Sequence, residues 1–242
     1  HHPYIRDVES CYLSSSLAVD LAKKYDADLH VFHLTTEKEM ELFTSGEVDN
    51  KKITAEVCVH HMHFNNSYYA ELGNQIKCNP SIKMESDRLA LIDALKGNKI
   101  DIIATDHAPH TWDEKNQDYP NAPAGLPLVQ HGLQILMDFY HEGILSLEMI
   151  VEKTSHNVAK RFQIKDRGYI REGYYADLTV LDLGKPYEVS KENILYKVGW
   201  SPFTGKTFNS SIFMTVVNGH IAFQDGKVND DTPLGMQIEF DR

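Results

Sequence analysis

Residues 100–115 read IDIIATDHAPHTWDEK, and the stretch changes character at its middle. The first five residues, 100–104, are mostly apolar and rich in isoleucine, which favours a short buried strand. Asp106, His107 and His110 then fall within five residues of one another. Carboxylates and imidazoles serve as metal ligands and as proton donors and acceptors, so a functional site is expected where this strand ends.

Two other stretches have strand composition and also end in histidine. Residues 28–34, DLHVFHL, contain His33, and residues 53–59, ITAEVCV, run into His60 and His61. A single histidine at a strand end is usually a hydrogen-bonded structural residue. Three successive strands that end in ligand-type side chains favour a metal or acid–base site instead.

Predicted helices separate the three strands. Apolar residues recur at helical spacing over 9–26, Glu39 has capping-box spacing at the start of 36–43, and Gly97 follows a helix over 86–95. Strand and helix therefore alternate, which indicates an α/β protein built from parallel β/α units. In a (β/α)8 barrel the carboxyl ends of the strands converge on the face that carries the active site, so we expect the strand-end residues to gather there.

The second part of the chain has a different pattern. Helices are predicted near residues 128–141 and 147–162. Beyond residue 167 the spacing indicates short antiparallel strands, with Asn218-Gly219 as a hairpin turn. We therefore expect two domains, a β/α domain over residues 1–165 and a small β module over residues 166–242.

Composition and charge narrow the range of partners. The chain has 242 residues and a formal net charge of −11, which argues against a nucleic-acid or anionic-membrane surface and leaves a small-molecule substrate. No apolar run reaches the length of a membrane span. Cys11, Cys58 and Cys78 are odd in number and far apart, so neither a disulfide framework nor a CxxC metal motif is expected, and a cytoplasmic location is predicted.

The side chains at the three strand ends, His33, His60-His61 and Asp106, are candidate metal ligands, because Zn²⁺ accepts both imidazole nitrogen and carboxylate oxygen. Asp106 is also a candidate proton acceptor, since a bound divalent ion makes water more acidic. His110 lies beyond Pro109, where we expect the loop mouth and a substrate carboxylate or carbonyl.

Other polar residues have plainer explanations. His107 is expected to be a solvated loop residue. Neighbouring residues on a strand point to opposite faces, so at most one of His60 and His61 is expected to face the site. The glutamates of residues 37–41, Glu39 among them, are expected to form a solvated helix face.

Residues 104–115, ATDHAPHTWDEK, resemble the signature of dihydroorotases, in which Asp, any residue, Ala-Pro-His, four residues and Lys follow one another. The matching positions are Asp106, Ala108, Pro109, His110 and Lys115. Six further stretches resemble the same family: HVFHLTT (30–36), ITAEVCVHH (53–61), IKCNPSIK (76–83), APAGLPLVQHGL (122–133), GYIREGYYADLTVLD (168–182) and WSPFTGKTF (200–208). The resemblance thus covers nearly the whole chain.

The resemblance implies a cyclic amidohydrolase that interconverts dihydroorotate and N-carbamoyl-L-aspartate in pyrimidine biosynthesis. It implies one or two zinc ions, with His33 and Asp106 among the ligands and Asp106 as the residue that shuttles the proton. The implied substrate contacts are Asn79 for the ring, His110 for the carboxylate, and backbone groups near Ala124 and Gly125.

The chain also departs from the family pattern. Ser81 and Lys83 stand where Pro and Arg are common, and Val59 replaces a frequent Pro. The His-x-His-x-Arg motif of the first strand, the bridging Lys or Asp of the fourth strand and the His of the fifth strand have no match. The three predicted strands therefore correspond to the sixth to eighth. We expect the C-terminal part of a metal-dependent (β/α)8 barrel, followed by a small β-sandwich module.

The incompleteness of the ligand set has consequences. With two metal ligands and exposed strand edges, residues 1–242 alone are expected to be inactive and prone to aggregate, and further ligands are expected upstream. A homodimer is predicted from the resemblance. The alternatives are a hydantoinase- or allantoinase-like cyclic amidohydrolase and a non-catalytic dihydroorotase-like subunit. The presence of Asp106 and Asn79 argues against the non-catalytic alternative.

Overall fold

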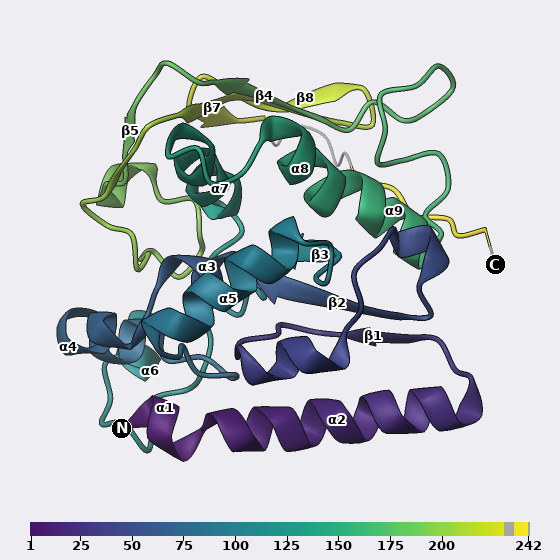
Figure 1. Ribbon diagram of the computed structural model, residues 1–242. Coiled ribbons are helices and arrows are strands. Elements are labelled where there is room, and N and C mark those ends of the chain that lie inside the picture. The colour runs from purple at the N-terminus through teal and green to yellow at the C-terminus, as the bar shows by residue number, and fades with distance from the viewer. Residues whose placement is uncertain (230–234, 242) are drawn as a thin grey trace. The chain divides into compact units, whose positions relative to one another are not determined.

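The computed structural model describes residues 1–229 and 235–241 and contains a three-stranded parallel sheet (Figure 1). Strands β1 (Leu29–Val31), β2 (Ile53–Cys58) and β3 (Ile102–Ala104) lie in the order β1-β2-β3. The three predicted strands and the α/β class are thus confirmed. Because all three strands run in the same direction, their carboxyl ends reach the same edge of the sheet.

Two long helices belong to this part of the chain. Helix α2 (Val8–Tyr25) precedes β1 and runs beside it, and α5 (Glu85–Lys96) lies between β2 and β3 in the sequence. The Asp7 side chain caps α2 by accepting a hydrogen bond from Ser10 N at 2.8 Å. One face of α5 is buried and apolar, and each large side chain buried in this way contributes about 1.5–3 kcal/mol.

Short helical elements occupy the remaining connections. They are α1 (His2–Ile5), η1 (Lys38–Leu42), η2 (Val48–Asn50), α3 (Val59–His63), η3 (Asn66–Tyr68), α4 (Tyr69–Leu72), η4 (Gly73–Ile76) and α6 (Trp112–Lys115). The helix predicted over residues 36–43 is therefore the 3₁₀ turn η1, and the chain enters α3 directly after β2.

The outer face of α2 carries an apolar stripe. Leu13, Leu17 and Leu21 are exposed, whereas Ser15 and Val19 are buried. β1 is also an edge strand of its sheet. An exposed apolar stripe beside a strand edge associates readily with other apolar surfaces, which is consistent with the predicted tendency to aggregate.

The prediction that Glu39 lies on a solvated helix face is wrong. Its buried carboxylate accepts hydrogen bonds from Ser15 Oγ at 2.6 Å, Thr36 Oγ1 at 2.8 Å, Thr36 N at 3.1 Å and Thr35 N at 3.3 Å. Thr36 Oγ1 accepts in return from Glu39 N at 3.2 Å, so the predicted capping pattern is present. The carboxylate is buried because it satisfies donors from both the turn and α2.

The later part of the chain first forms helices. They are α7 (Gly132–His141), α8 (Leu147–Val151) and α9 (Asn157–Phe162), and the π-helical turn η5 (Glu152–His156) joins α8 to α9. These elements confirm the two helices predicted in this region, the second of which contains the π-helical turn.

Antiparallel strands follow. Strands β4 (Leu178–Asp182), β7 (Ser211–Val217), β8 (His220–Gln224) and β9 (Lys227–Val228) form a sheet of order β4-β7-β8-β9, while β5 (Tyr187–Glu188) and β6 (Thr207–Phe208) pair separately, with η6 (Lys191–Asn193) between them in the chain. Asn218 and Gly219 both have positive φ at the turn between β7 and β8, as the predicted hairpin requires. The β-sandwich arrangement stays a prediction.

Two compact units divide the chain: residues 1–132 with 194–204, and residues 133–193 with 205–242. The boundary near residue 165 was predicted from a change in sequence pattern, and it stays a prediction. Residues 230–234 and 242 of the predicted β module lie outside the described residues. None of the helices in the described part of the chain is both long and apolar enough to cross a membrane.

Replacing Glu39 with alanine is expected to lower the free energy of unfolding by about 3 kcal/mol, because the buried donors around it lose their acceptor. Glu41→Ala is the matched control, since Glu41 lies in the same turn but is exposed, and it is expected to change that free energy by less than about 0.5 kcal/mol. Urea unfolding followed by circular dichroism measures both values. Equal stability of the two variants would contradict the buried role of Glu39.

Candidate active site

His33 and Asp106 occupy equivalent places on two strands. Each lies two residues beyond the last residue of its strand, β1 for His33 and β3 for Asp106. Each also adopts the left-handed backbone conformation, with φ of 41° and 47°. This conformation is unfavourable for residues other than glycine and is concentrated at functional sites. The structure therefore places both predicted metal ligands at the carboxyl edge of the sheet, each in the left-handed backbone conformation.

The surroundings of His33 are suited to a cation. Among the described residues its Nδ1 is buried and has no hydrogen-bond partner. A buried ring nitrogen without a partner is costly, and a neutral imidazole nitrogen with a free lone pair is a good ligand for Zn²⁺. The Asp106 carboxylate supplies the oxygen ligand that such an ion also accepts. The two residues therefore fit the metal that the family resemblance implies.

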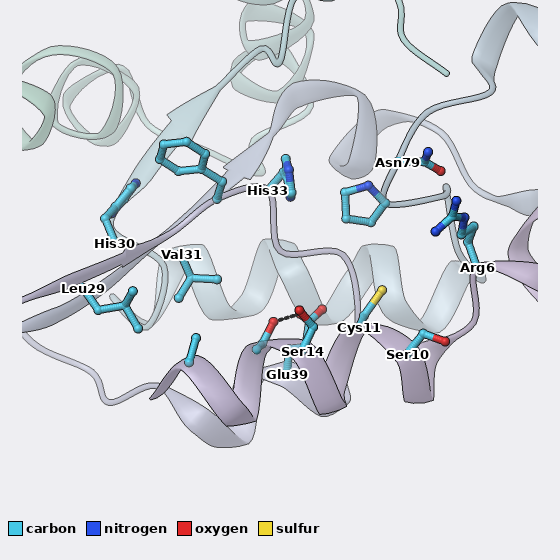
Figure 2. A pocket seen from close by; sticks show the side chains of 14 residues that line it. Arg6, Ser10, Cys11, Ser14, Leu29, His30, Val31, His33, Glu39 and Asn79 are labelled. Atoms are coloured by element: carbon cyan, nitrogen blue, oxygen red, sulfur yellow. Dashed lines mark hydrogen bonds between the residues drawn. The ribbon is translucent and has the colours of Figure 1, made fainter. Parts of the chain in front are cut away.

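A cavity of about 520 Å³ lies beside β1 and brings His33 and Asn79 together (Figure 2). Asn79 is exposed at the cavity wall, and Arg6 lines the same space. Asp106 is not among the residues that line it. The cavity thus combines a candidate metal ligand, an amide that can both donate and accept hydrogen bonds, and a positive charge.

Lys115 holds the loops of the site together. Its Nζ is buried and donates hydrogen bonds to three carbonyl oxygens, those of Lys77 at 3.0 Å, Pro123 at 2.9 Å and Gly125 at 2.9 Å. Burial lowers the pKa of the Lys115 ammonium to about 8. One side chain therefore ties the residues that precede Asn79 to the loop of residues 123–125.

Gly125 is required by a close backbone approach. Its φ is +140°, and a Cβ atom at this position would lie 2.5 Å from the carbonyl oxygen of Ala108. Gly125 N donates to the Lys77 carbonyl at 2.8 Å, so both backbone polar groups of Gly125 bond within the protein. The neighbouring Ala124 carbonyl accepts a hydrogen bond from His110 Nε2 at 3.2 Å. His110, Ala124 and Gly125 are therefore adjacent, although a substrate contact by any of them stays a prediction.

His107 is an exposed loop residue that also bonds to the backbone. Its Nδ1 accepts hydrogen bonds from Leu128 N at 3.0 Å and Val129 N at 3.2 Å, and partial burial lowers its pKa. The exposure agrees with the expectation of a solvated loop residue, and the imidazole in addition joins the two ends of the loop that contains His110.

Residues 194–204 brace the same loop. Trp200 Nε1 donates to the His110 carbonyl at 2.8 Å. Tyr196 Oη and Ser201 Oγ lie 3.3 Å and 3.2 Å from His131 Nδ1, and burial lowers the pKa of His131 to about 4. The stretch around Trp200 resembles a family motif, but the sequence did not indicate that Trp200 supports the His110 loop. Only the tertiary structure brings the two segments together.

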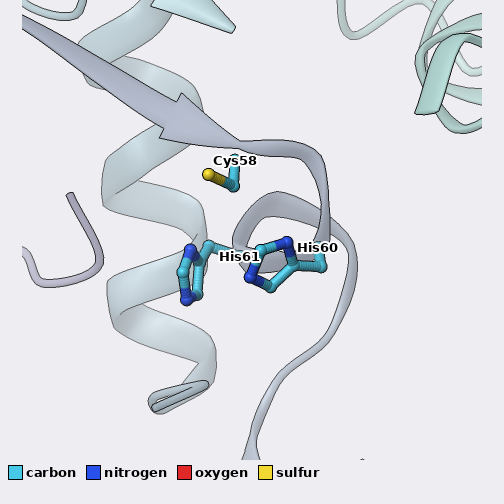
Figure 3. A group of neighbouring side chains, drawn as sticks. All are labelled: Cys58, His60 and His61. Atoms are coloured by element: carbon cyan, nitrogen blue, oxygen red, sulfur yellow. The ribbon is translucent and has the colours of Figure 1, made fainter. Parts of the chain in front are cut away.

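His60 and His61 do not follow the predicted strand alternation. Both belong to α3 rather than to β2, and both are buried. Their ring centroids are 4.0 Å apart, and Cys58 lies beside them (Figure 3). Burial lowers the pKa of His61 to about 3 and that of His60 well below its usual value. The expectation that they point to opposite faces is wrong, because a helical turn replaces the extended backbone on which it depended.

Residues 17–222 match the amidohydrolase family, and the chain therefore belongs to that family. It is similar to the dihydroorotase of Endomicrobium trichonymphae, with 35% identity over 84% of this chain and 49% of that protein. The dihydroorotase of Methanosphaera stadtmanae is 34% identical over 94% of this chain and 52% of that protein. The chain thus spans about half the length of these curated relatives. The resemblance to dihydroorotases predicted from the sequence is confirmed.

Two solved structures have a fold similar to that of this chain. The L-hydantoinase from Arthrobacter aurescens has a TM-score of 0.84 and 23% identity, over 93% of this chain and 51% of that one. The dihydropyrimidinase from Brevibacillus agri NCHU1002 has a TM-score of 0.83 and 20% identity, over 94% of this chain and 51% of that one. At these identities the likeness concerns the fold alone.

Replacing Lys115 with methionine is expected to lower the free energy of unfolding by about 3 kcal/mol, because three carbonyl oxygens lose their donor. Lys23→Met is the control, since Lys23 is exposed on α2, and it is expected to change the value by less than about 0.5 kcal/mol. Chemical denaturation measures both. A Lys115→Met protein as stable as the control variant would show that the three bonds contribute little.

Acid is expected to destabilise the protein partly through His131. Its pKa is about 4 in the folded chain against 6.5 for an ordinary histidine, so the unfolded state binds more protons between these pH values. The stabilisation is therefore present in full above pH 6.5 and is lost as the pH falls towards 4. Unfolding measured against pH should show a weaker acid dependence for His131→Gln than for the unsubstituted chain. His220→Gln, an exposed control on β8, should keep the full dependence.

Proposed function

We propose that this chain is the part of a dihydroorotase that contains the sixth to eighth β/α units of a (β/α)8 barrel and a following β module. Together with the rest of such a barrel it would interconvert dihydroorotate and N-carbamoyl-L-aspartate, a step of pyrimidine biosynthesis. The observation that carries the proposal is the matched placement of His33 and Asp106 at the ends of two parallel strands, in a chain similar to proteins named dihydroorotase.

His33 Nδ1 and the Asp106 carboxylate would hold the metal, for which Zn²⁺ is the proposed identity. When bound, such an ion acts as a Lewis acid on the amide carbonyl and makes water a better nucleophile. Catalytic zinc sites usually use three protein ligands, so the proposal requires at least one ligand besides these two.

Asp106 would move the proton. At the end of its strand the carboxylate can accept a proton from the attacking water and then donate it to the leaving amide nitrogen. Its left-handed backbone, two residues beyond β3, directs the residue out of the strand. Holding the carboxylate in one place lowers the entropic cost of both transfers.

The other residues would bind the substrate. Asn79 offers a donor and an acceptor to the cyclic amide from the wall of the cavity, and Arg6 on the same wall offers a positive charge to an anionic substrate. His110 would approach the substrate carboxylate from the loop that Lys115 and Trp200 brace. Ala124 and Gly125 would complete the substrate site through their backbone.

The first alternative substrate is another cyclic amide, such as a hydantoin or allantoin. The structural likeness to hydantoinases is compatible with this alternative, although at 23% identity or less it speaks for the fold alone. The Asp106–Lys115 signature and Asn79-Pro80 favour dihydroorotate. A non-catalytic subunit is less well supported, because His33, Asn79 and Asp106 are all present. The cytoplasmic location and the homodimer remain predictions.

Asp106→Asn is expected to lower kcat about 10³-fold while changing KM little, because the amide cannot take up and release the proton. The measurement is dihydroorotate turnover by the zinc-loaded natural gene product that contains residues 1–242, with hydantoin as the competing substrate. Asp113→Asn, an exposed residue of the same loop, is the control and should retain full activity. Faster turnover of hydantoin, or an active Asp106→Asn protein, would overturn the proposal.

A further inference from the structure

A second group of ligand-type side chains lies directly after β2. Cys58 is the last residue of β2, and His60 and His61 lie in the five-residue helix α3 that follows it. One ligand atom from each residue, the thiol sulfur and two ring nitrogens, lies within 4.8 Å of the others (Figure 3). All three residues are buried. The group is compact and closed to solvent.

The imidazoles of this group have lone pairs that nothing in the described chain satisfies. Neither ring nitrogen of His60 meets a partner at normal hydrogen-bond geometry among the described residues, and the same holds for His61 Nδ1. The Thr105 backbone acts on His60 only as the smallest influence on its pKa, which burial dominates. His61 Nε2 donates to the Pro80 carbonyl at 3.0 Å, so Nδ1 of the neutral ring carries the free lone pair. Leaving a buried polar group unsatisfied is costly, so such groups in a well-packed interior indicate a missing partner.

A cation satisfies this group better than a hydrogen-bond donor does. Two imidazole nitrogens and a thiol sulfur are the ligand types that Zn²⁺ and similar borderline ions prefer. The carboxylates of Glu56 and Asp106 both act electrostatically on Cys58, and this negative charge favours a bound cation. Cys58 would bind as the thiolate, with the thiol proton released to solvent.

We propose that Cys58, His60 and His61 form a metal site for Zn²⁺ or a similar borderline divalent cation, separate from the pair His33 and Asp106. The site goes beyond the proposed hydrolysis. Because its ligands are buried, an ion there has no access to substrate and would act structurally, by fixing the turn from β2 into α3. The ion also supplies the partner that the buried imidazoles otherwise lack.

Cobalt substitution tests the proposal on the whole 242-residue chain. Co²⁺ bound by a thiolate gives a sulfur-to-metal charge-transfer band in the near ultraviolet, which ligation by His33 and Asp106 cannot produce. We expect one equivalent of Co²⁺ to give this band. Cys58→Ser and His61→Asn are expected to abolish it or to weaken the affinity of that equivalent more than about tenfold, since even loss of a residue that only orients a ligand has an effect of that size.

The chain offers a matched control. Cys11, on α2 outside this group, is also a free thiol, and Cys11→Ser should keep the band at full intensity. Zn²⁺ should raise the thermal midpoint of the unsubstituted chain and of Cys11→Ser more than that of Cys58→Ser, which keeps only the pair His33 and Asp106. This second measurement does not depend on the spectrum of cobalt.

Two results would overturn the proposal. One is the absence of a thiolate band from the unsubstituted chain at saturating Co²⁺, a result that requires no variant to fold. The other is a band that survives in Cys58→Ser but disappears in Cys78→Ser, which would assign the ligand to the neighbouring buried thiol, whose Sγ lies 3.8 Å from His61 Nε2. Neither result would contradict the proposed hydrolysis, which the turnover assay tests separately, because the band reports only on ligation by a thiolate.

Discussion

The parallel pairing of β1 and β3 on the two sides of β2 is the constraint on which the candidate site depends. Parallel strands end at one edge, so residues that follow different strands meet there however far apart they lie in the sequence. At both His33 and Asp106 the chain turns away from its strand through a single residue in the left-handed conformation. Such a turn is tolerated because the backbone on either side is held by sheet pairing and loop contacts.

Buried polar groups then hold the loops above that edge. Lys115 donates to three carbonyl oxygens, and Glu39 accepts hydrogen bonds from α2 and from its own turn. Each of these groups is charged or strongly polar, and each is compensated by specific partners, as burial demands. The imidazoles of His60 and His61 are the contrasting case, which is why they point to a ligand of their own.

Periodicity and motif spacing predicted much of this protein. The three strands, the long helices and the hairpin at Asn218 follow from local patterns, since apolar spacing and turn residues reflect short-range geometry. The errors share a different cause. Glu39 was expected in solvent and His60 and His61 on opposite faces, because each interpretation assumed a regular element. The chain instead makes a 3₁₀ turn at the first position and an immediate helix at the second.

By itself the sequence determined the α/β class, the family resemblance and the identity of the candidate ligands, because these depend on residue type and local spacing. Tertiary structure alone decided which polar groups are buried together. It brought Trp200 to His110 and Lys115 to three separate carbonyl oxygens, and it buried the neighbouring Cys58, His60 and His61. The reason is that hydrogen bonding and desolvation depend on neighbours in space, and a local sequence pattern carries no information about them.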